Sequence, residues 1–307
     1  MPLRPGVHNV TATPFLPDEA LDEASLPTLV GYCLAAGCEG MLILGVLGEA
    51  DKLSDAERDR VVAGVVEAAA GRLQITVGVT HPSTVVTKER AHAALLLGAD
   101  AVMVSPPPGS AAGPALRDHF LRVADGLDPK ATFVVQDHPT SSGVKLPVPF
   151  LAQLGEGLPP GSVVKLEEPP TAPKMAALRD ATDAYHLFGG LGGVSLLHEL
   201  DAGADGTMTG FALPETLVRI VAAFRAGDRE GARRVFEAAL PLMVFEAQPG
   251  AGVALRKEIL RRRGALAHAA VRRPAPTPDA FSFGLLDRLL AETAVALAAT
   301  EAVTSGA

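Results

Sequence analysis

Short apolar runs alternate with longer amphipathic segments along most of the chain. The runs are rich in Val, Leu and Ile, and a near-continuous run of this kind is typical of a strand buried on both faces. The pattern predicts eight strands, at residues 7–13, 40–44, 73–79, 101–105, 132–137, 162–165, 185–188 and 206–209.

The segments between these runs carry apolar residues at helical spacing, and several end at a glycine. Ser54 followed by Glu57 forms a capping box, which marks the start of one helix. The predicted helices lie at residues 22–36, 54–70, 84–97, 115–127, 148–154, 172–179 and 194–202. Eight alternating units favour an α/β fold with a closed parallel (β/α)8 barrel, or TIM barrel, over an open sheet.

The pattern changes after the eighth strand, because only helices follow. They are predicted at residues 214–226, 228–245, 251–263 and 278–299, with a Pro-rich connector at 272–278. The first of them completes the barrel, and the others form a C-terminal helical extension. We therefore expect a barrel over residues 1–226 and the extension over residues 227–307.

The composition is that of a folded globular protein with a large core, since 48% of the 307 residues are hydrophobic and 20% are charged. A net charge of -8 argues against a nucleic-acid partner, which requires a basic surface. The densest basic run consists of Arg256, Lys257 and residues 261–263. At helical spacing it is interpreted as a solvated or subunit-facing stripe.

Two cysteines, Cys33 and Cys38, have no second pair with which to form a zinc set, and so few cysteines favour a reducing compartment. The N-terminus lacks the pattern of a signal peptide, and no apolar run reaches the ~18 residues of a membrane span. We expect a cytoplasmic protein with no membrane partner.

In a barrel of this kind, the active site lies at the C-terminal ends of the strands. That rule selects Thr13, residues 45–49, Thr80, His81, Ser105, residues 136–138, Lys165, Gly189, Gly190, Met208 and Thr209.

Lys165 is the most unusual of these residues, because it ends an apolar strand and is followed by Glu167, Glu168 and two prolines. A functional interpretation is a desolvated amine with a lowered pKa, available to form a Schiff base with a carbonyl substrate. A structural interpretation is a lysine that reaches water or pairs with a neighbouring carboxylate. This stretch alone leaves both open.

The other candidates are also ambiguous. Gly45 and Gly48 could turn backbone amides toward an anion or form an ordinary turn, and the glycine-rich stretch at 189–193 could approach a ligand or open the next helix. His138 could be a general acid/base or a surface histidine. Asp137, His138 and His81 lack the spacing of a known metal site, so neither a metal nor a cofactor is expected.

Taken together and in order, several stretches resemble the dihydrodipicolinate synthase/N-acetylneuraminate lyase family of class I aldolases and lyases. They are Thr13-Pro14-Phe15, residues 45–54 (Gly-x-x-Gly-Glu-x-x-x-Leu-Ser), 97–101 with Pro106, 136–143, Val164-Lys165 and 203–206. The resemblance covers essentially the whole chain, and Lys165 falls where the family has its Schiff-base lysine. The functional interpretation of Lys165 is thereby favoured.

The chain also departs from the family pattern. The family's first loop reads Gly-Thr-Thr-Gly-Glu, and here Val46 and Leu47 retain the amides but lack the hydroxyls that hold a 2-oxo acid carboxylate. Gln136 replaces the catalytic tyrosine and cannot move protons at neutral pH. Ser141 replaces the arginine that binds the second substrate of the synthases. Residues 107–108, both proline, replace a tyrosine pair and suggest a drier pocket for an apolar or bulky aldehyde half.

The resemblance implies a cofactor-independent carbon–carbon or carbon–oxygen lyase of the class I aldolase type that forms an imine at Lys165 with pyruvate, another 2-oxo acid or its aldol adduct. The departures argue against an authentic dihydrodipicolinate synthase. Gln136 would orient the imine or the leaving hydroxyl, and His138 would be the acid/base, with a water held by Gln136 or Thr209 as the fallback. The substrate-binding residues would be Gly45, Val46, Leu47, Gly48, Glu49, Ser141, Gly189, Gly190 and Met208. A homo-oligomer, tetramer or dimer, is expected.

Two alternatives remain at this stage. The lost tyrosine, hydroxyl pair and arginine favour a catalytically impaired barrel that serves as a ligand-binding or regulatory subunit, while the retained Lys165 argues against it. A barrel isomerase or hydrolase that uses His138 and Asp137 without an imine is a second enzyme alternative.

Overall fold

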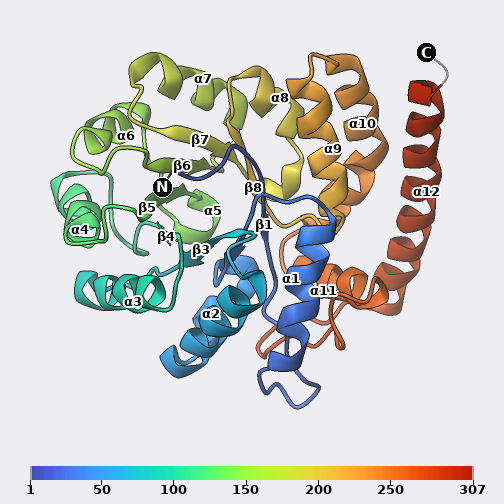
Figure 1. The fold of residues 1–307 in the computed structure, drawn as a ribbon, viewed down its shortest axis with the longest axis horizontal. Coiled ribbons are helices and arrows are strands. Elements are labelled where there is room, and N and C mark those ends of the chain that lie inside the picture. The colour runs from blue at the N-terminus through green and yellow to red at the C-terminus, as the bar shows by residue number, and fades with distance from the viewer. Residues whose placement is uncertain (1, 306–307) are drawn as a thin grey trace.

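The chain folds as a closed parallel barrel of eight strands in sequential order, surrounded by helices (Figure 1). This computed structural model describes residues 2–305, and the side chains of residues 2–301. The strands are β1 (Gly6–Val10), β2 (Gly40–Ile43), β3 (Gln74–Gly78), β4 (Ala101–Val104), β5 (Thr132–Asp137), β6 (Val163–Leu166), β7 (His186–Gly189) and β8 (Gly206–Thr209). The predicted (β/α)8 barrel is therefore confirmed.

Helices pack on the outside of the strands. The α-helices of the barrel are α1 (Leu26–Ala35), α2 (Asp55–Ala69), α3 (Thr84–Leu96), α4 (Pro114–Ala124), α6 (Val148–Gly155), α7 (Thr171–Ala181), α8 (Leu196–Asp201) and α9 (Pro214–Arg225). The predicted capping box of α2 is present, because Ser54 Oγ accepts from Glu57 N and the Glu57 side chain accepts from Ser54 N.

Two apolar cores hold this architecture. The larger lies between the strands and the surrounding helices, as expected for strands that are buried on both faces. The smaller fills the barrel interior, and Leu3, which precedes the first strand, belongs to it. The interior therefore has a packed base, and the open end of the barrel is the one formed by the C-terminal ends of the strands.

Three further α-helices follow the barrel: α10 (Arg229–Glu246), α11 (Gly252–Arg262) and α12 (Ala280–Ser305). In Figure 1, α12 runs along the edge of the molecule beside α10. The last helix continues beyond residue 299, where the sequence pattern placed its end, and residues 306–307 lie outside the described residues. The loop between α10 and α11 reaches the open end of the barrel, where it lines the cavity described below.

Several short elements escape the sequence pattern. They are one α-helical turn, α5 (Pro139–Ser142), and the 3-10 helices η2 (Val46–Gly48), η3 (Ala50–Lys52) and η4 (Leu191–Gly193), whereas the 3-10 helix η1 (Glu23–Ser25) falls inside the helix predicted at residues 22–36. Each of the first four lies in a loop that follows a strand, where a few residues of turn give no periodic signal. These loops shape the open end of the barrel.

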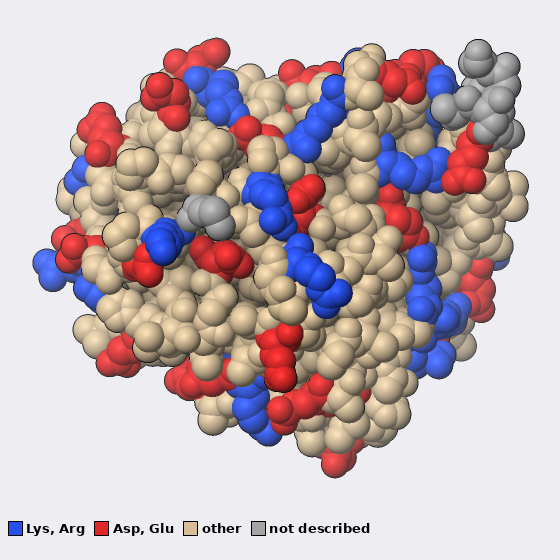
Figure 2. Space-filling view, viewed as in Figure 1, with Lys and Arg blue, Asp and Glu red and all other residues tan. Residues whose placement is uncertain are grey.

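The basic run on α11 corrects one interpretation of the sequence. Arg256 and Lys257 are buried, because Arg256 pairs with Glu246 and Lys257 pairs with Glu49. They therefore do not belong to a solvated stripe, whereas the side chains of residues 261–263 are partly exposed and ion-paired. Figure 2 shows acidic and basic side chains intermingled on one face of the molecule. Within the described residues, no helix has the length and apolar character needed to span a membrane.

Candidate active site

A cavity of about 400 Å³ opens at the C-terminal ends of the strands. Residues from β1, β4, β5, β6 and β8, from the loops after the strands and from the α10–α11 loop form its wall. The wall is made by Val10, Gly45, Val46, Leu47, Met103, Gln136, His138, Thr140, Lys165, Glu167, Leu191, Gly192, Val194, Met208, Thr209, Gly210, Glu246, Ala247, Gln248, Pro249, Gly250, Gly252, Val253 and Arg256. The size is that of a small-molecule site.

Lys165 projects into this cavity from β6. Its neighbours across the sheet are Gln136 on β5 and Phe188 on β7. The side chain is 5% exposed, and its Nζ lies 3.1 Å from Oε2 of Glu167. Because alternate strand residues face the same side, Lys165 and Glu167 both point inward, while Leu166 between them packs in the outer core.

The Glu167 carboxylate has two hydrogen-bond donors besides the lysine. It accepts hydrogen bonds from Nε2 of Gln136 (2.8 Å) and from the backbone N–H of Leu191 (3.2 Å). Burial alone would raise the pKa of Glu167, but Lys165, His138 and these two donors outweigh that effect and hold it below its usual value. The site therefore keeps an ionised carboxylate beside the lysine.

Gln136 is held at both ends of its amide. Ser105 Oγ donates to Gln136 Oε1 at 2.6 Å, and the backbone N–H of Ser105 in turn donates to Thr80 Oγ1 at 2.9 Å. This fixes the amide orientation, so that the Nε2 group points at Glu167. Gln136 thus orients the carboxylate directly.

His138 lines the cavity just after β5, the strand that neighbours the Lys165 strand β6. Its Nδ1 lies 2.8 Å from Ser141 Oγ, and Ser141 does not itself belong to the cavity wall. Burial lowers the pKa of His138, with Glu167 opposing and Lys165 reinforcing that effect. Asp137 turns the other way and pairs with Lys174 of α7 at 2.6 Å, so no Asp137–His138 dyad faces the cavity.

The loop after β2 presents backbone rather than hydroxyl groups. Within it, Gly48 N donates to Gly45 O and Glu49 N to Val46 O, which leaves the N–H groups of Val46 and Leu47 without an acceptor among the described residues. Val46 is 53% exposed, unusually for a large apolar residue, and it lines the cavity together with Leu47. The loop therefore offers two free amides under an apolar rim.

Several other residues selected from the sequence occupy supporting positions. Glu49 turns away from the cavity, where its carboxylate accepts from Lys257, Lys52 and the backbone N–H of Arg272. Gly190 leaves room for the Glu167 carboxylate, which an added Cβ would strike. Of the rest, Gly45, Met208 and Thr209 line the wall, and Gly48, Gly189, Gly190, Pro107 and Pro108 do not.

Sequence reasoning gave Glu167 no catalytic role and assigned the α10–α11 loop none. Glu167 was weighed only as a charge partner for Lys165, although its spacing of two from the lysine was a usable signal. Glu246 and Arg256 carry no local signal, because only the tertiary fold brings α10 and α11 over the barrel mouth.

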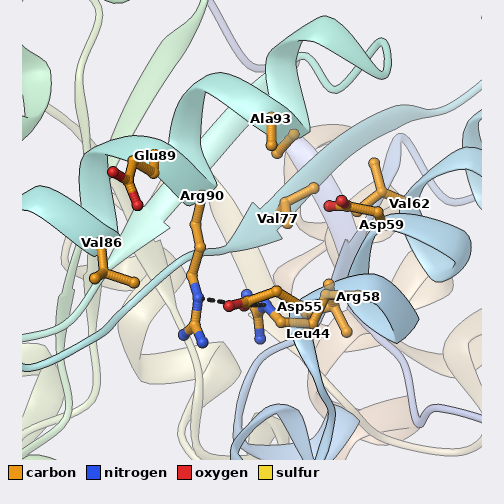
Figure 3. A pocket seen from close by; sticks show the side chains of 11 residues that line it. Leu44, Asp55, Arg58, Asp59, Val62, Val77, Val86, Glu89, Arg90 and Ala93 are labelled. Carbon is orange, nitrogen blue, oxygen red and sulfur yellow. Dashed lines mark hydrogen bonds and ion pairs between the residues drawn. The ribbon is translucent and has the colours of Figure 1, made fainter.

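A second cavity, of about 180 Å³, lies on the outside of the barrel between α2 and α3 (Figure 3). There Arg90 reaches toward Asp55 at 2.8 Å and also donates to the carbonyl of Thr80. Arg58 donates to the carbonyls of Gly78 and Ala50. Both arginines are engaged in holding α2 and α3 against the strand ends, so this cavity is structural.

The barrel with a buried lysine and carboxylate at its open end defines the class of protein, and comparisons specify the family. The model of the dihydrodipicolinate synthetase family matches residues 4–280. An L-2-keto-3-deoxyarabonate dehydratase from Azospirillum brasilense is 33% identical over 281 residues, which cover 90% of each chain. A 4-hydroxy-tetrahydrodipicolinate synthase from Sorangium cellulosum is 32% identical over 241 residues, 77% of this chain and 79% of that one.

A solved structure agrees with these sequence relatives. The dihydrodipicolinate synthase from Rhodopseudomonas palustris has a TM-score of 0.89 and 31% identity, covering 95% of this chain and 99% of that one. The chain belongs to the dihydrodipicolinate synthetase family. It is accordingly a lyase of the aldolase type with a TIM barrel.

Proposed function

We propose that this protein is a carbon–oxygen lyase that removes water from a 2-oxo acid carrying a hydroxyl group at C4, through an imine at Lys165. The observation that carries the proposal is the buried contact between Lys165 and Glu167, in a cavity that no tyrosine lines among the described residues. The substrate class is a 2-keto-3-deoxy sugar acid, and no cofactor takes part.

The first step is imine formation. Glu167 lies 3.1 Å from the amine and accepts a proton from the ammonium, which frees the lone pair of Lys165 for attack on C2. Glu167 then returns this proton to the C2 oxygen, which leaves as water, so that an iminium remains and Glu167 is again ionised. The free N–H groups of Val46 and Leu47 bind the C1 carboxylate and so hold C2 toward the lysine.

The second step moves the proton at C3. An iminium acidifies this position, and a carboxylate beside the lysine nitrogen is within reach of the adjacent carbon. Glu167 takes the proton, the resulting enamine expels the C4 hydroxyl as water, and His138 supplies the proton to the leaving oxygen. Hydrolysis of the new imine consumes the water released in the first step and returns an unsaturated 2-oxo acid.

The replacement of tyrosine by Gln136 favours this elimination over aldol cleavage. Breaking the C3–C4 bond requires a base at the C4 hydroxyl, and the Gln136 amide is not one. Its Oε1 and Nε2 are moreover committed to Ser105 and Glu167. The name of the Azospirillum brasilense relative, a 2-keto-3-deoxyarabonate dehydratase, supports the same reaction class. The homo-oligomer and the cytoplasmic location stay predictions.

Product analysis tests the proposal. A five-carbon 2-keto-3-deoxy acid is incubated with the purified protein, and the products are identified by mass spectrometry. We expect the mass to fall by one water. Pyruvate and glycolaldehyde as the products would mean aldol cleavage and would overturn the assignment, and an unchanged substrate with no Lys165 adduct would favour the ligand-binding alternative.

A further inference from the structure

Opposite β6, the cavity wall contains a buried ion pair that the reaction at Lys165 does not use. Arg256 of α11 donates through Nε to Glu246 at the end of α10. The two side chains are 4% and 0% exposed. Both oxygens of Glu246 also lie 3.1 Å from the backbone N–H of Ala212, in the loop after β8. The pair is thus anchored to the barrel.

The terminal nitrogens of Arg256 are free to act on a ligand. Nε is the only atom of this guanidinium with a hydrogen-bond partner among the described residues. The two terminal nitrogens have no hydrogen-bond partner among the described residues and are not fully buried. They therefore remain accessible from the cavity that Arg256 lines. A ligand in the cavity can therefore accept from N–H groups that are held in one rigid plane.

Thr209, the last residue of β8, lines the same cavity. It is 2% exposed, and its Oγ1 has no partner among the described residues. The next residue is Gly210, and the Cζ of Arg256 lies 3.6 Å from where a Cβ on it would be. Burying two charges costs several kcal/mol per ion before they pair. Two apolar side chains of the same volume would fill this part of the wall equally well. A ligand-facing role explains why the wall is polar here.

We propose that Arg256, Glu246 and Thr209 form a specificity site for the hydroxyl groups on the distal half of the substrate. The inference rests on the proposed function and specifies its substrate as a 2-oxo acid with hydroxyls beyond C4 and an uncharged far end. Glu246 neutralises Arg256, so the site as a whole carries no net positive charge with which to bind a second carboxylate. A substrate hydroxyl can accept a hydrogen bond from the Arg256 guanidinium and donate one to an oxygen of the same site.

This placement differs from the apolar or bulky distal half that the sequence suggests. Val46 and Leu47 do form an apolar rim, but Glu246 at the end of α10 and Arg256 of α11 add a polar side to the cavity. The distal hydroxyls therefore lie toward β8 and α11, while the reacting carbons lie toward β6.

The test is a selectivity ratio measured with two substrates. One is 4,5-dihydroxy-2-oxopentanoate, and the other is 4-hydroxy-2-oxopentanoate, which lacks only the distal hydroxyl. The variant is the double substitution E246Q/R256M, since Gln still accepts from Ala212 and neither buried charge is left unpaired. Arg261→Met, on the exposed face of α11, is the matched control.

We expect the natural protein to favour the dihydroxy acid in kcat/KM by about 10–100-fold, the range for one hydrogen bond to a charged group. In E246Q/R256M the ratio falls to near one, chiefly through KM, and Arg261→Met keeps the natural ratio. An unchanged ratio in the double variant would overturn the inference, as would a stronger preference for a dicarboxylate.

Borohydride reduction with pyruvate, which has no distal half, distinguishes a failure of this inference from a failure of the proposed function. If the double variant loses the pyruvate adduct as strongly as it loses the dihydroxy acid, Arg256 binds the C1 carboxylate and the inference is wrong. If no 2-oxo acid forms an adduct with the natural protein, the proposed function itself fails and this inference fails with it.

Discussion

Nζ of Lys165 lies 3.1 Å from Oε2 of Glu167 in a wall where both side chains are almost fully buried. Two residues apart at the end of β6, they face the cavity together, and Gly190 provides the space that the carboxylate fills. The proposed nucleophile and the proposed base are thereby fixed relative to each other at the end of one strand.

The first prediction concerns Glu167 as the base at C3. In Glu167→Gln, Lys165 keeps a hydrogen-bond partner but loses the carboxylate that accepts its proton, so the imine with pyruvate forms more slowly, and proton exchange is measured once it has formed. Exchange of the pyruvate C3 protons with D2O, followed by NMR, is expected to slow by about 10²–10⁴-fold. Exchange at the natural rate in the variant would remove Glu167 from this role.

The second prediction concerns His138 as the acid for the leaving hydroxyl. Burial lowers the pKa of His138, so the protonated imidazole becomes scarce as the pH rises toward neutral. We expect kcat to decline on the alkaline side, and His138→Asn to be slower and to lack that decline. Thr140→Ala, a change in the same wall, serves as the control. The same alkaline decline in His138→Asn would assign the proton to another group.

The third prediction concerns the space at Gly190. A Cβ at this position strikes the Glu167 carboxylate, so Gly190→Ala displaces the base and costs about 1–3 kcal/mol of stability. Gly31→Ala is the matched control, because a Cβ there meets nothing within 4 Å in α1, and we expect it to stabilise by about 0.5–1 kcal/mol. Denaturant unfolding together with activity checks both; full activity in Gly190→Ala contradicts the packing argument.

The fourth prediction concerns Glu199 on α8, which accepts from Thr171 at 2.7 Å and whose Oε2 has no partner within the described part of the chain. Burial raises its pKa to about 7. The folded state therefore binds more protons than the unfolded state between its usual pKa and pH 7, so this group's contribution to stability is lost as the pH rises through that window. We expect Glu199→Gln to gain about 3 kcal/mol relative to the natural protein between pH 4.5 and pH 7.5.

Urea unfolding at several pH values measures this difference. The comparison with Glu199→Gln cancels the contributions of other groups, among them His8, whose pKa is lowered by burial to about 4 and whose effect has the opposite sign. A pH-independent difference between the two proteins would mean that the pKa of Glu199 is the same in the folded and unfolded states, and would contradict the prediction.

The barrel followed from the sequence because each strand has a local signal, a β-branched run between amphipathic helices. Lys165 and Gln136 could be singled out because the fold places strand ends at one opening. Arg256 and Lys257 were misinterpreted, since their burial depends on Glu246 and Glu49 from other elements. Helical spacing describes one element only and says nothing about which charges its neighbours supply.

The central claim is that Lys165 forms an imine with a 2-oxo acid, and borohydride reduction in the presence of pyruvate tests it most directly. The account predicts a reduced pyruvyl adduct that peptide mapping assigns to Lys165, retained in Lys145→Ala, whose lysine side chain is 75% exposed, and absent in Lys165→Ala. No adduct with pyruvate or any other 2-oxo acid, or an adduct that persists in Lys165→Ala, would contradict it.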